Sequence, residues 1–251
     1  MIRTHFSGDD DALNRVAAEC VSGFDENGRV IYTGRNTIKV FDTPYGRLNV
    51  KAYRVPSLLN RIVYSFLRKP KGRRAFDYPR LMEAAGVSTP RVIAYMEERR
   101  TGLIARSWLV TEQSRLEHTM YEFGDRDLSA AADRDAIAAF ARFAARMHEA
   151  GVLHRDFSPG NILFDRIDGQ WRFSLVDINR MSFGAVSVRK GCRNMARLWG
   201  QPAMFRLLAA EYAVVRGGDA EECLKWIDEA RTRFWRRFSR RHPVKYTYRP
   251  L

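Results

Sequence analysis

The chain reads HRDFSPGN over residues 154–161, and this polar stretch guides the interpretation of the whole sequence. An alanine-rich segment, 130–150, precedes it with apolar residues on one face, so we predict a helix that ends at Gly151. Two short apolar runs follow within residues 162–176, and the second leads directly into Asp177. This order predicts a polar loop between a helix and a pair of strands, with an aspartate at the far strand end.

Three oxygen-bearing side chains of this region suit phosphoryl transfer from a nucleotide. Such a transfer depends mostly on positioning and on neutralising phosphate charge, with one carboxylate facing the acceptor hydroxyl. The HxD-xxxx-N spacing places Asp156 as the candidate base and Asn161 as a metal ligand, while Asp177 adds a second hard oxygen ligand for Mg²⁺. We expect His154 to brace the loop. An isolated HxD can also be a capped helix end with a surface aspartate, but the neighbouring helix and strand pair favour the catalytic interpretation.

Strand-forming residues dominate the first half of the chain and helix-forming residues the second. The patterns predict strands at 30–32, 37–41, 48–53, 91–95 and 107–111. Besides the alanine-rich helix, they predict helices at 56–76, 77–85, 194–215 and 220–238. We therefore predict an α+β, two-lobed protein with a β-rich N-lobe over 1–112 and a helical C-lobe over 113–251.

Positive charge is the main feature of the composition. The formal net charge is +14 and the pI about 10.1, a balance that favours polyanionic partners such as anionic lipid, phosphorylated glycan or nucleic acid. No nucleic-acid-binding motif is recognisable, so we expect no specific nucleic acid partner. Two basic amphipathic segments, 56–74 and 231–251, suit anionic headgroups, with the alternative that their apolar stripes pack on their own lobes.

Cysteine usage and hydropathy indicate the compartment. The three cysteines form no CxxC pair, and no signal peptide or membrane-spanning stretch is recognisable. We expect a cytoplasmic protein that could lie peripherally on the cytosolic face of the inner membrane, without an obligate protein partner.

The sequence resembles the lipopolysaccharide kinase family, the Kdo and core-heptose kinases of the protein-kinase-like superfamily. The similar stretches are NVKAYRVPSLLNRIVYSFLRK, RAFDYPRLMEAAGVSTPRVIAY, HRDFSPGNILF and WRFSLVDINRM, which cover most of residues 45–185. The resemblance implies a protein-kinase-like fold, ATP and Mg²⁺ as cofactors, and phosphorylation of a sugar hydroxyl, of Kdo or heptose, on the lipid A inner core.

The resemblance also assigns residues to the nucleotide site. Lys51 is similar to the kinase lysine that contacts the α- and β-phosphates, and Asp77 stands where the family has its acidic partner, with Glu83 as a weaker rival. We also expect Gly34 and Glu112 to belong to the nucleotide-binding site. Asp156, Lys51, Asn161 and Asp177 are the expected catalytic residues, and Asn161 and Asp177 the expected metal ligands.

Several departures from protein kinases argue against a conventional protein substrate. No GxGxxG precedes Lys51, Asp177-Ile178-Asn179 stands in place of DFG, and Ser158 replaces the lysine that follows the catalytic aspartate. An atypical RIO-like protein kinase and another small-molecule phosphotransferase remain alternatives, although the positive charge argues against cationic acceptors such as aminoglycosides. A pseudokinase binding module is a third alternative, which the intact set of candidate residues disfavours.

Overall fold

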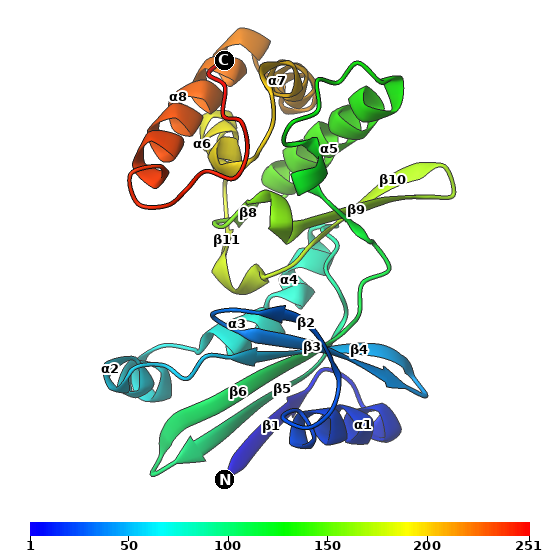
Figure 1. Cartoon of the computed structure of the whole chain (residues 1–251), viewed down its shortest axis with the longest axis vertical. Helices are drawn as coiled ribbons and strands as arrows, with labels where there is room; N and C mark the ends of the chain where they lie inside the picture. The colour runs from blue at the N-terminus through cyan, green and yellow to red at the C-terminus, as the bar shows by residue number, and fades with distance from the viewer. The chain divides into compact units, whose positions relative to one another are not determined.

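The computed structural model describes all 251 residues, and they form two compact units (Figure 1). The first unit comprises residues 1–81 and 89–115, and the second comprises residues 82–88 and 116–251. The first is built on a large sheet and the second mainly on helices, which confirms the predicted α+β class. The lobe boundaries given above place segment 82–88 in the N-lobe, whereas by compactness it belongs with the second unit.

A six-stranded antiparallel sheet forms the first unit, in the order β1-β5-β6-β4-β3-β2. Its strands are β1 Ile2–Phe6, β2 Arg29–Thr33, β3 Thr37–Thr43, β4 Gly46–Tyr53, β5 Val92–Arg100 and β6 Leu103–Glu112. The five strands predicted from the sequence are all present, and β1 is an additional edge strand. The hairpin between β3 and β4 pairs Thr43 with Gly46, whose φ of +96° suits glycine.

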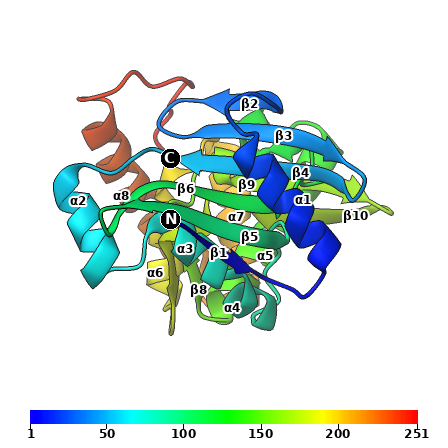
Figure 2. The same ribbon diagram turned by 90° about the horizontal axis from the view of Figure 1, so that it is seen from below.

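Helix α1, Asp11–Ser22, covers one face of this sheet, as Figures 1 and 2 show. The Asp10 side chain begins the helix by accepting hydrogen bonds from the backbone N–H groups of Ala12 and Leu13. The buried face of α1 and the sheet residues beneath it form one apolar core: Leu13, Ala17, Cys20, Val21, Phe24, Phe41, Leu48, Val50, Ile93, Ala94, Met96, Trp108 and Val110. This core gives the central strands a rigid support.

The single amphipathic helix predicted over 56–76 is wrong. The structure has a short α2, Leu58–Ile62, a π-helical turn η1, Val63–Leu67, and a separate α3, Lys71–Asp77. Arg68 between them is extended, with φ −144° and ψ 133°. Pro70 accounts for the break, because proline disfavours helical backbone before it and begins a new helix well.

Helices α5, Ala131–Glu149, α7, Pro202–Arg216, and α8, Ala220–Phe238, form the body of the second unit, with α7 packed against the other two. The predicted helix at 77–85 is observed as α4, Pro79–Ala84. The helix predicted over 194–215 starts too early. Residues 188–194 form α6, Val188–Asn194, a 3₁₀ turn η5, Met195–Arg197, follows, and α7 begins at Pro202 because proline fits the first helical position.

Short strands complete the second unit. They form a three-stranded sheet of β7 His118–Thr119, β9 Ile162–Ile167 and β10 Gln170–Leu175, and a two-stranded ladder of β8 Val152–His154 with β11 Met181–Phe183. Three more 3₁₀ turns are η2 Met120–Phe123, η3 Pro159–Asn161 and η4 Ile178–Arg180. The strands frame the loop that carries the HRDFSPGN stretch.

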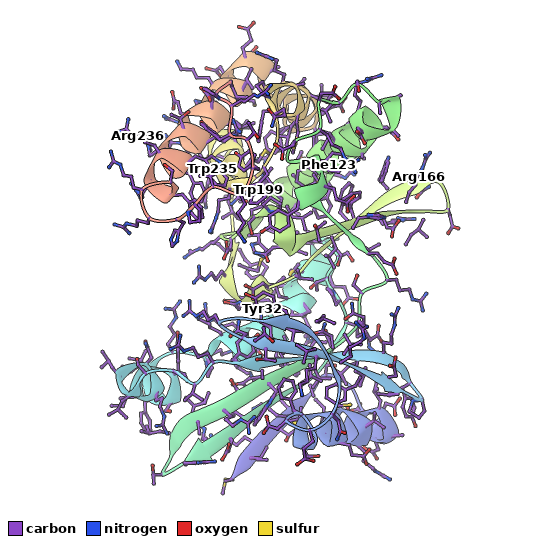
Figure 3. All side chains as sticks on the ribbon, viewed as in Figure 1. Tyr32, Phe123, Arg166, Trp199, Trp235 and Arg236 are labelled. Carbon is purple, nitrogen blue, oxygen red and sulfur yellow. The ribbon has the colours of Figure 1, made fainter.

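The basic helix α8 buries one stripe of residues within its own unit. Four residues at intervals of four turn inward: Cys223, Ile227, Arg231 and Trp235. Phe234 and Phe238 are only half-buried. The buried Arg231 guanidinium lies 3.6 Å from the centre of the Phe205 ring, and Figure 3 shows Trp235 turned inward and Arg236 outward. The apolar face of α8 is therefore used within its own unit. None of the helices combines the length and the apolar character that crossing a bilayer requires.

Helix α6 packs so closely that it tolerates only glycine at position 191. A Cβ atom at Gly191 would collide with the Tyr212 hydroxyl and with Nδ1 of His148. We expect Gly191→Ala to lower the free energy of unfolding by about 1–3 kcal/mol, as overpacking of a core does. Urea unfolding followed by circular dichroism measures this. Gly8→Ala, at a position with no atom within 4 Å of the added Cβ, is the matched control. An unchanged midpoint for Gly191→Ala would contradict the packing described.

Candidate active site

Backbone pairing holds the beginning of the HRDFSPGN loop. Strand β8 pairs with β11, so that His154 lies opposite Met181, and the Arg155 N–H donates to the Arg180 carbonyl at 2.9 Å. The loop then closes on itself, because the N–H of Ser158 donates to the Asp156 carbonyl at 2.8 Å. Asp156 is thus fixed between a strand and a tight turn, and its backbone position does not depend on a ligand.

His154 is fully buried and links the loop to the end of β10. Its Nδ1 accepts a hydrogen bond from the Asp156 N–H at 3.1 Å, which requires the proton to be on Nε2. Nε2 then donates to the Val176 carbonyl at 3.1 Å. Burial lowers the pKa of His154 below its usual 6.5, although the nearby carboxylates of Asp156 and Asp177 oppose this. The ring is therefore a neutral brace, as the sequence predicted, between the two aspartates.

Asn161 adds the second connection between the same two segments. Its side-chain Nδ2 donates to the Asp156 carbonyl at 2.8 Å, and its backbone carbonyl accepts from the Val176 N–H at 3.0 Å. The amide nitrogen is thereby used inside the loop, which leaves the side-chain oxygen as the atom that can ligate a cation. The structure therefore brings the predicted Asp156, Asn161 and Asp177 together around His154.

Asp177 has a left-handed backbone, with φ 53° and ψ 41°, directly after the apolar strand β10. Few residues other than glycine adopt this conformation, and asparagine and aspartate do so most readily. Nδ2 of Asn179 donates to the Asp177 carboxylate at 2.6 Å, while Oδ1 of the buried Asn179 has no hydrogen-bond partner. The chain therefore turns away from the direction of β10 at Asp177. Asn179 occupies the position of the glycine in a DFG motif.

A second buried histidine supports the loop from the helical side. Nδ2 of Asn194 donates to the His154 carbonyl at 2.9 Å, and its Oδ1 accepts from Nε2 of His148 at 3.1 Å. The Tyr212 hydroxyl then donates to Nδ1 of His148 at 3.0 Å. Burial lowers the pKa of His148 to about 4, so this ring too is neutral. Helices α5, α6 and α7 are thereby connected to the backbone of the loop.

Two arginines that the sequence interpretation missed bind the candidate base. Arg197 forms a close ion pair with Oδ1 of Asp156, and Nη1 of Arg180 lies 3.6 Å from Oδ2. Arg180 follows Asp177 by three residues and could have been suspected from the motif. Arg197 lies forty-one residues beyond Asp156, in the turn η5, and no pattern in the sequence marks it. The cationic partner that Ser158 cannot supply therefore comes from elsewhere in the chain.

The predicted nucleotide residues Lys51 and Gly34 belong to the first unit. Lys51 lies in the middle of β4, opposite Ile38 of β3 and Leu109 of β6, with Nζ 5.4 Å from the centre of the Tyr53 ring. Gly34 lies in the turn between β2 and β3, on the hairpin that precedes the lysine strand. The order of a hairpin turn followed by a lysine on the next strand suits phosphate binding, and both assignments stay predictions.

Asp77 and Glu112 have ion pairs of their own. The Asp77 carboxylate accepts from Lys69 at 2.7 Å and from Arg73 at 3.0 Å, and its pairing with Lys51 stays a prediction. Arg73 lies one turn away on α3, which explains its preference. Glu112 ends β6 and pairs with Arg91 at 3.1 Å on the surface. Their roles in nucleotide binding stay predictions, as does that of the rival Glu83.

The donor set around His154 fits a hard divalent cation. Asp177 offers carboxylate oxygens and Asn161 an amide oxygen, which are the ligands that Mg²⁺ prefers, and the structure contains no cluster of three or more His, Cys, Asp or Glu side chains that could hold a metal alone. Such a partial set suits Mg²⁺ that takes its remaining ligands from phosphate and water.

The two buried histidines predict how stability depends on pH. An unfolded histidine titrates near 6.5, whereas the pKa of His148 in the folded protein is about 4. When the pH falls below 6.5, the unfolded chain binds protons that the folded chain does not, so stabilisation is complete above about pH 6.5 and is lost toward pH 4. We expect His148→Gln to flatten this acid-side slope in urea unfolding at several pH values. His242→Gln, at an exposed position, is the control and should keep the slope of the unmodified chain; equal slopes for both variants would contradict the prediction.

Comparisons with known proteins agree with this geometry. The model of the lipopolysaccharide kinase (Kdo/WaaP) family matches residues 25–204, a range that includes Lys51, the HRDFSPGN loop and both arginines. Proteins named 3-deoxy-D-manno-octulosonic acid kinase from three strains of Xanthomonas campestris pv. campestris are 30% identical over 172 residues. That match covers 66% of this chain and 65% of those relatives, so the chain spans about two thirds of their length.

A solved structure shows the same fold. The structure described as WaaP in complex with acyl carrier protein superimposes with a TM-score of 0.60, covering 93% of this chain and 99% of that chain at 19% identity. This likeness confirms the kinase-like fold expected from the sequence. Together with the family match over most of the sequence, it leads to one conclusion: the chain belongs to the lipopolysaccharide kinase (Kdo/WaaP) family.

Proposed function

We propose that this protein is an ATP-dependent kinase that phosphorylates a hydroxyl of Kdo, or of heptose, in the inner core of a lipid A-linked saccharide. The observation that carries the proposal is the convergence of Asp156, Asn161 and Asp177 around the neutral ring of His154, in a member of the lipopolysaccharide kinase family. The 30% identical relatives are named 3-deoxy-D-manno-octulosonic acid kinase, which favours Kdo over heptose. We propose Mg²⁺ as the metal, because the donor set consists of hard oxygen atoms.

In this proposal each residue has one task. The Asp156 carboxylate accepts the proton of the acceptor hydroxyl while that oxygen forms its bond to the γ-phosphorus and ADP leaves. Asn161 and Asp177 hold the metal, which when bound neutralises charge on the β- and γ-phosphates. Lys51 contacts the α- and β-phosphates. The hydrogen bonds of His154 and Asn161 keep the loop from Asp156 to Asn161 and the residue before Asp177 in position before substrates arrive.

Arg180 and Arg197 are proposed to position the base and to receive the acceptor. Both side chains bind Asp156 and stay partly exposed, Arg180 to 47% and Arg197 to 33%, so they can orient the carboxylate and meet an anionic group of the substrate. Kdo carries a carboxylate, and guanidinium recognises carboxylates in a defined planar geometry. A protein kinase alternative gains nothing from this feature, since a neutral serine or threonine acceptor has no such anion beside the reacting hydroxyl.

The location of the reaction is also a proposal. An acceptor attached to lipid A and a donor such as ATP meet at the cytosolic face of the inner membrane, so we propose a cytoplasmic protein that works peripherally at that surface. The excess of positive charge, +14, supports such a location because the inner-leaflet surface is negative.

Mass spectrometry of lipid A-core tests the substrate class. Material from cells that produce the active protein should be heavier by one phosphate on the inner-core sugar than material from cells with an Asp156→Asn variant. Transfer of ³²P from labelled ATP to purified acceptor should show the same difference in vitro. If neither mass nor label differs, the protein does not have the proposed activity.

Removing the base should separate catalysis from binding. We expect Asp156→Asn to lower kcat by about 10²–10⁴-fold, the usual contribution of a general base, while MgATP still raises the melting temperature. Asp168→Asn is the control, because this exposed turn residue also has a left-handed backbone that asparagine tolerates. Loss of the thermal shift together with activity would point to a structural role for Asp156, and retained activity would remove it as the base.

Arg197 should affect the acceptor more than the nucleotide. We expect Arg197→Met to lower kcat/KM for the acceptor by about 10²-fold through misplacement of the base, with KM for ATP nearly unchanged. Arg197→Lys should recover part of the loss because it keeps the charge but not the planar fork. Arg193→Met, on the exposed side of α6, is the control. An equal rise in KM for both substrates would show a merely structural role. So would a fall in the melting temperature that matches the loss of activity.

A further inference from the structure

The outer face of α2 and η1 exposes an unusual concentration of large apolar side chains. Leu58, Leu59, Ile62, Phe66 and Leu67 are between 43% and 79% exposed, and they follow one another within ten residues. We call these five residues the apolar face. Single exposed leucines are common on proteins, but a contiguous apolar group of this kind marks an interaction surface.

The segment is attached to the sheet through polar groups, the reverse of an ordinary surface helix. Nε of Arg61 donates to the Ile104 carbonyl of β6 at 2.7 Å, and the Ser65 hydroxyl accepts from the Ile104 N–H at 3.0 Å. These two hydrogen bonds hold the inner side of the segment against the backbone of β6. The apolar face is consequently turned away from the sheet, although burial on its own core would have been the expected use of such residues.

The π-helical turn aligns the apolar face. The N–H of Arg68 donates to the Val63 carbonyl at 2.8 Å, a hydrogen bond across five residues. A π turn has more residues than an α turn, so Leu67 lies above Ile62, five residues earlier, instead of rotating to the inner side. Single π turns of this kind occur frequently at functional sites.

The stretch of sequence that contains the apolar face carries charge of one sign only. Residues 43–76 contain no Asp or Glu and nine cationic residues: Arg47, Lys51, Arg54, Arg61, Arg68, Lys69, Lys71, Arg73 and Arg74. The cationic residues nearest to the two ends of the apolar face are Arg54, which precedes it, and Arg68, which follows it. Both are exposed. The acidic residue that follows, Asp77, is paired with Lys69 and Arg73.

We propose that the apolar face of α2 and η1 inserts into the headgroup region of an anionic phospholipid bilayer, with Arg54 and Arg68 on lipid phosphates. A bilayer requires an apolar strip of adjacent residues and a flank of cations, and both are present. The positive charge of residues 43–76, with no acidic residue among them, complements the negative surface of an anionic bilayer. The C-terminal helix α8 is not part of this surface, because its apolar stripe is buried in its own unit.

Sedimentation with vesicles tests the proposal on the full-length chain without ATP or acceptor, so its outcome is separate from that of the proposed kinase reaction. We expect binding to vesicles of phosphatidylcholine with phosphatidylglycerol, and much weaker binding to phosphatidylcholine alone. The double variant Leu59→Asn with Phe66→Asn should lower the partition coefficient by about tenfold or more, since two inserted side chains are lost. Arg54→Gln with Arg68→Gln should lower it by about fivefold per cation, and added salt should reduce the difference.

The matched control removes two other exposed apolar side chains. Leu81→Asn with Val214→Asn changes the same number of positions, at 51% and 81% exposure, outside the apolar face. We expect unchanged vesicle binding for this control and unchanged melting temperatures for all variants, since every substituted side chain is exposed. Equal losses for the control and for Leu59→Asn with Phe66→Asn would overturn the proposal.

A fluorescent reporter distinguishes insertion from surface adsorption or a protein partner. The three native cysteines are buried, so a polarity-sensitive thiol dye can be placed on Leu59→Cys, with Val214→Cys as the control. A blue shift of the Leu59→Cys dye with anionic vesicles, absent for Val214→Cys, is the expected result. No shift with vesicles, or a shift only when an acidic soluble protein is added, would show that the face does not bind lipid.

Discussion

Both candidate aspartates are held in place by one neutral imidazole. The buried ring of His154 accepts the Asp156 N–H on one nitrogen and donates to the Val176 carbonyl, next to Asp177, from the other. Only the neutral ring can do both, because a protonated imidazole has no acceptor atom. Burial, which lowers the pKa of the ring, therefore maintains the arrangement of the loop as well as its packing. The side-chain amides of Asn161 and Asn194, which do not titrate, also hold the loop by donating to the backbone carbonyls of Asp156 and His154.

Charge at the site is arranged by tertiary contacts around this neutral frame. Asp156 is placed between Arg180 and Arg197, so its carboxylate is compensated although Ser158 stands where many kinases have lysine. The same two cations suit an acceptor that is itself anionic. Asp177, whose backbone is left-handed, offers carboxylate oxygens that suit a metal ion. An anionic sugar as the proposed acceptor is consistent with these two cations and with the family of the chain.

Two basic amphipathic segments use their apolar residues in opposite ways. Helix α8 turns Ile227 and Trp235 into the second unit and even buries Arg231 on an aromatic ring, so its cations merely cover the surface. In α2 and η1, Arg61 and Ser65 bind the backbone of β6 and leave the leucines outside. Hydropathy patterns cannot distinguish these cases, because a pattern shows that a helix has two faces and not which one the neighbouring element binds.

By itself the sequence determined the local structure and the residues of the catalytic loop. The predicted strands, the helices at 131–149 and 220–238, and the grouping of Asp156, Asn161 and Asp177 follow from periodicity and short-range spacing, which depend on neighbouring residues. The helix breaks at Pro70 and Pro202 are also local, because proline itself causes them, although the periodicity alone did not show them. Only the tertiary structure decided that Arg197 reaches Asp156 and that Leu59 and Phe66 are exposed. The physical reason is that ion pairs and burial depend on residues distant in the chain, whose meeting no local pattern records.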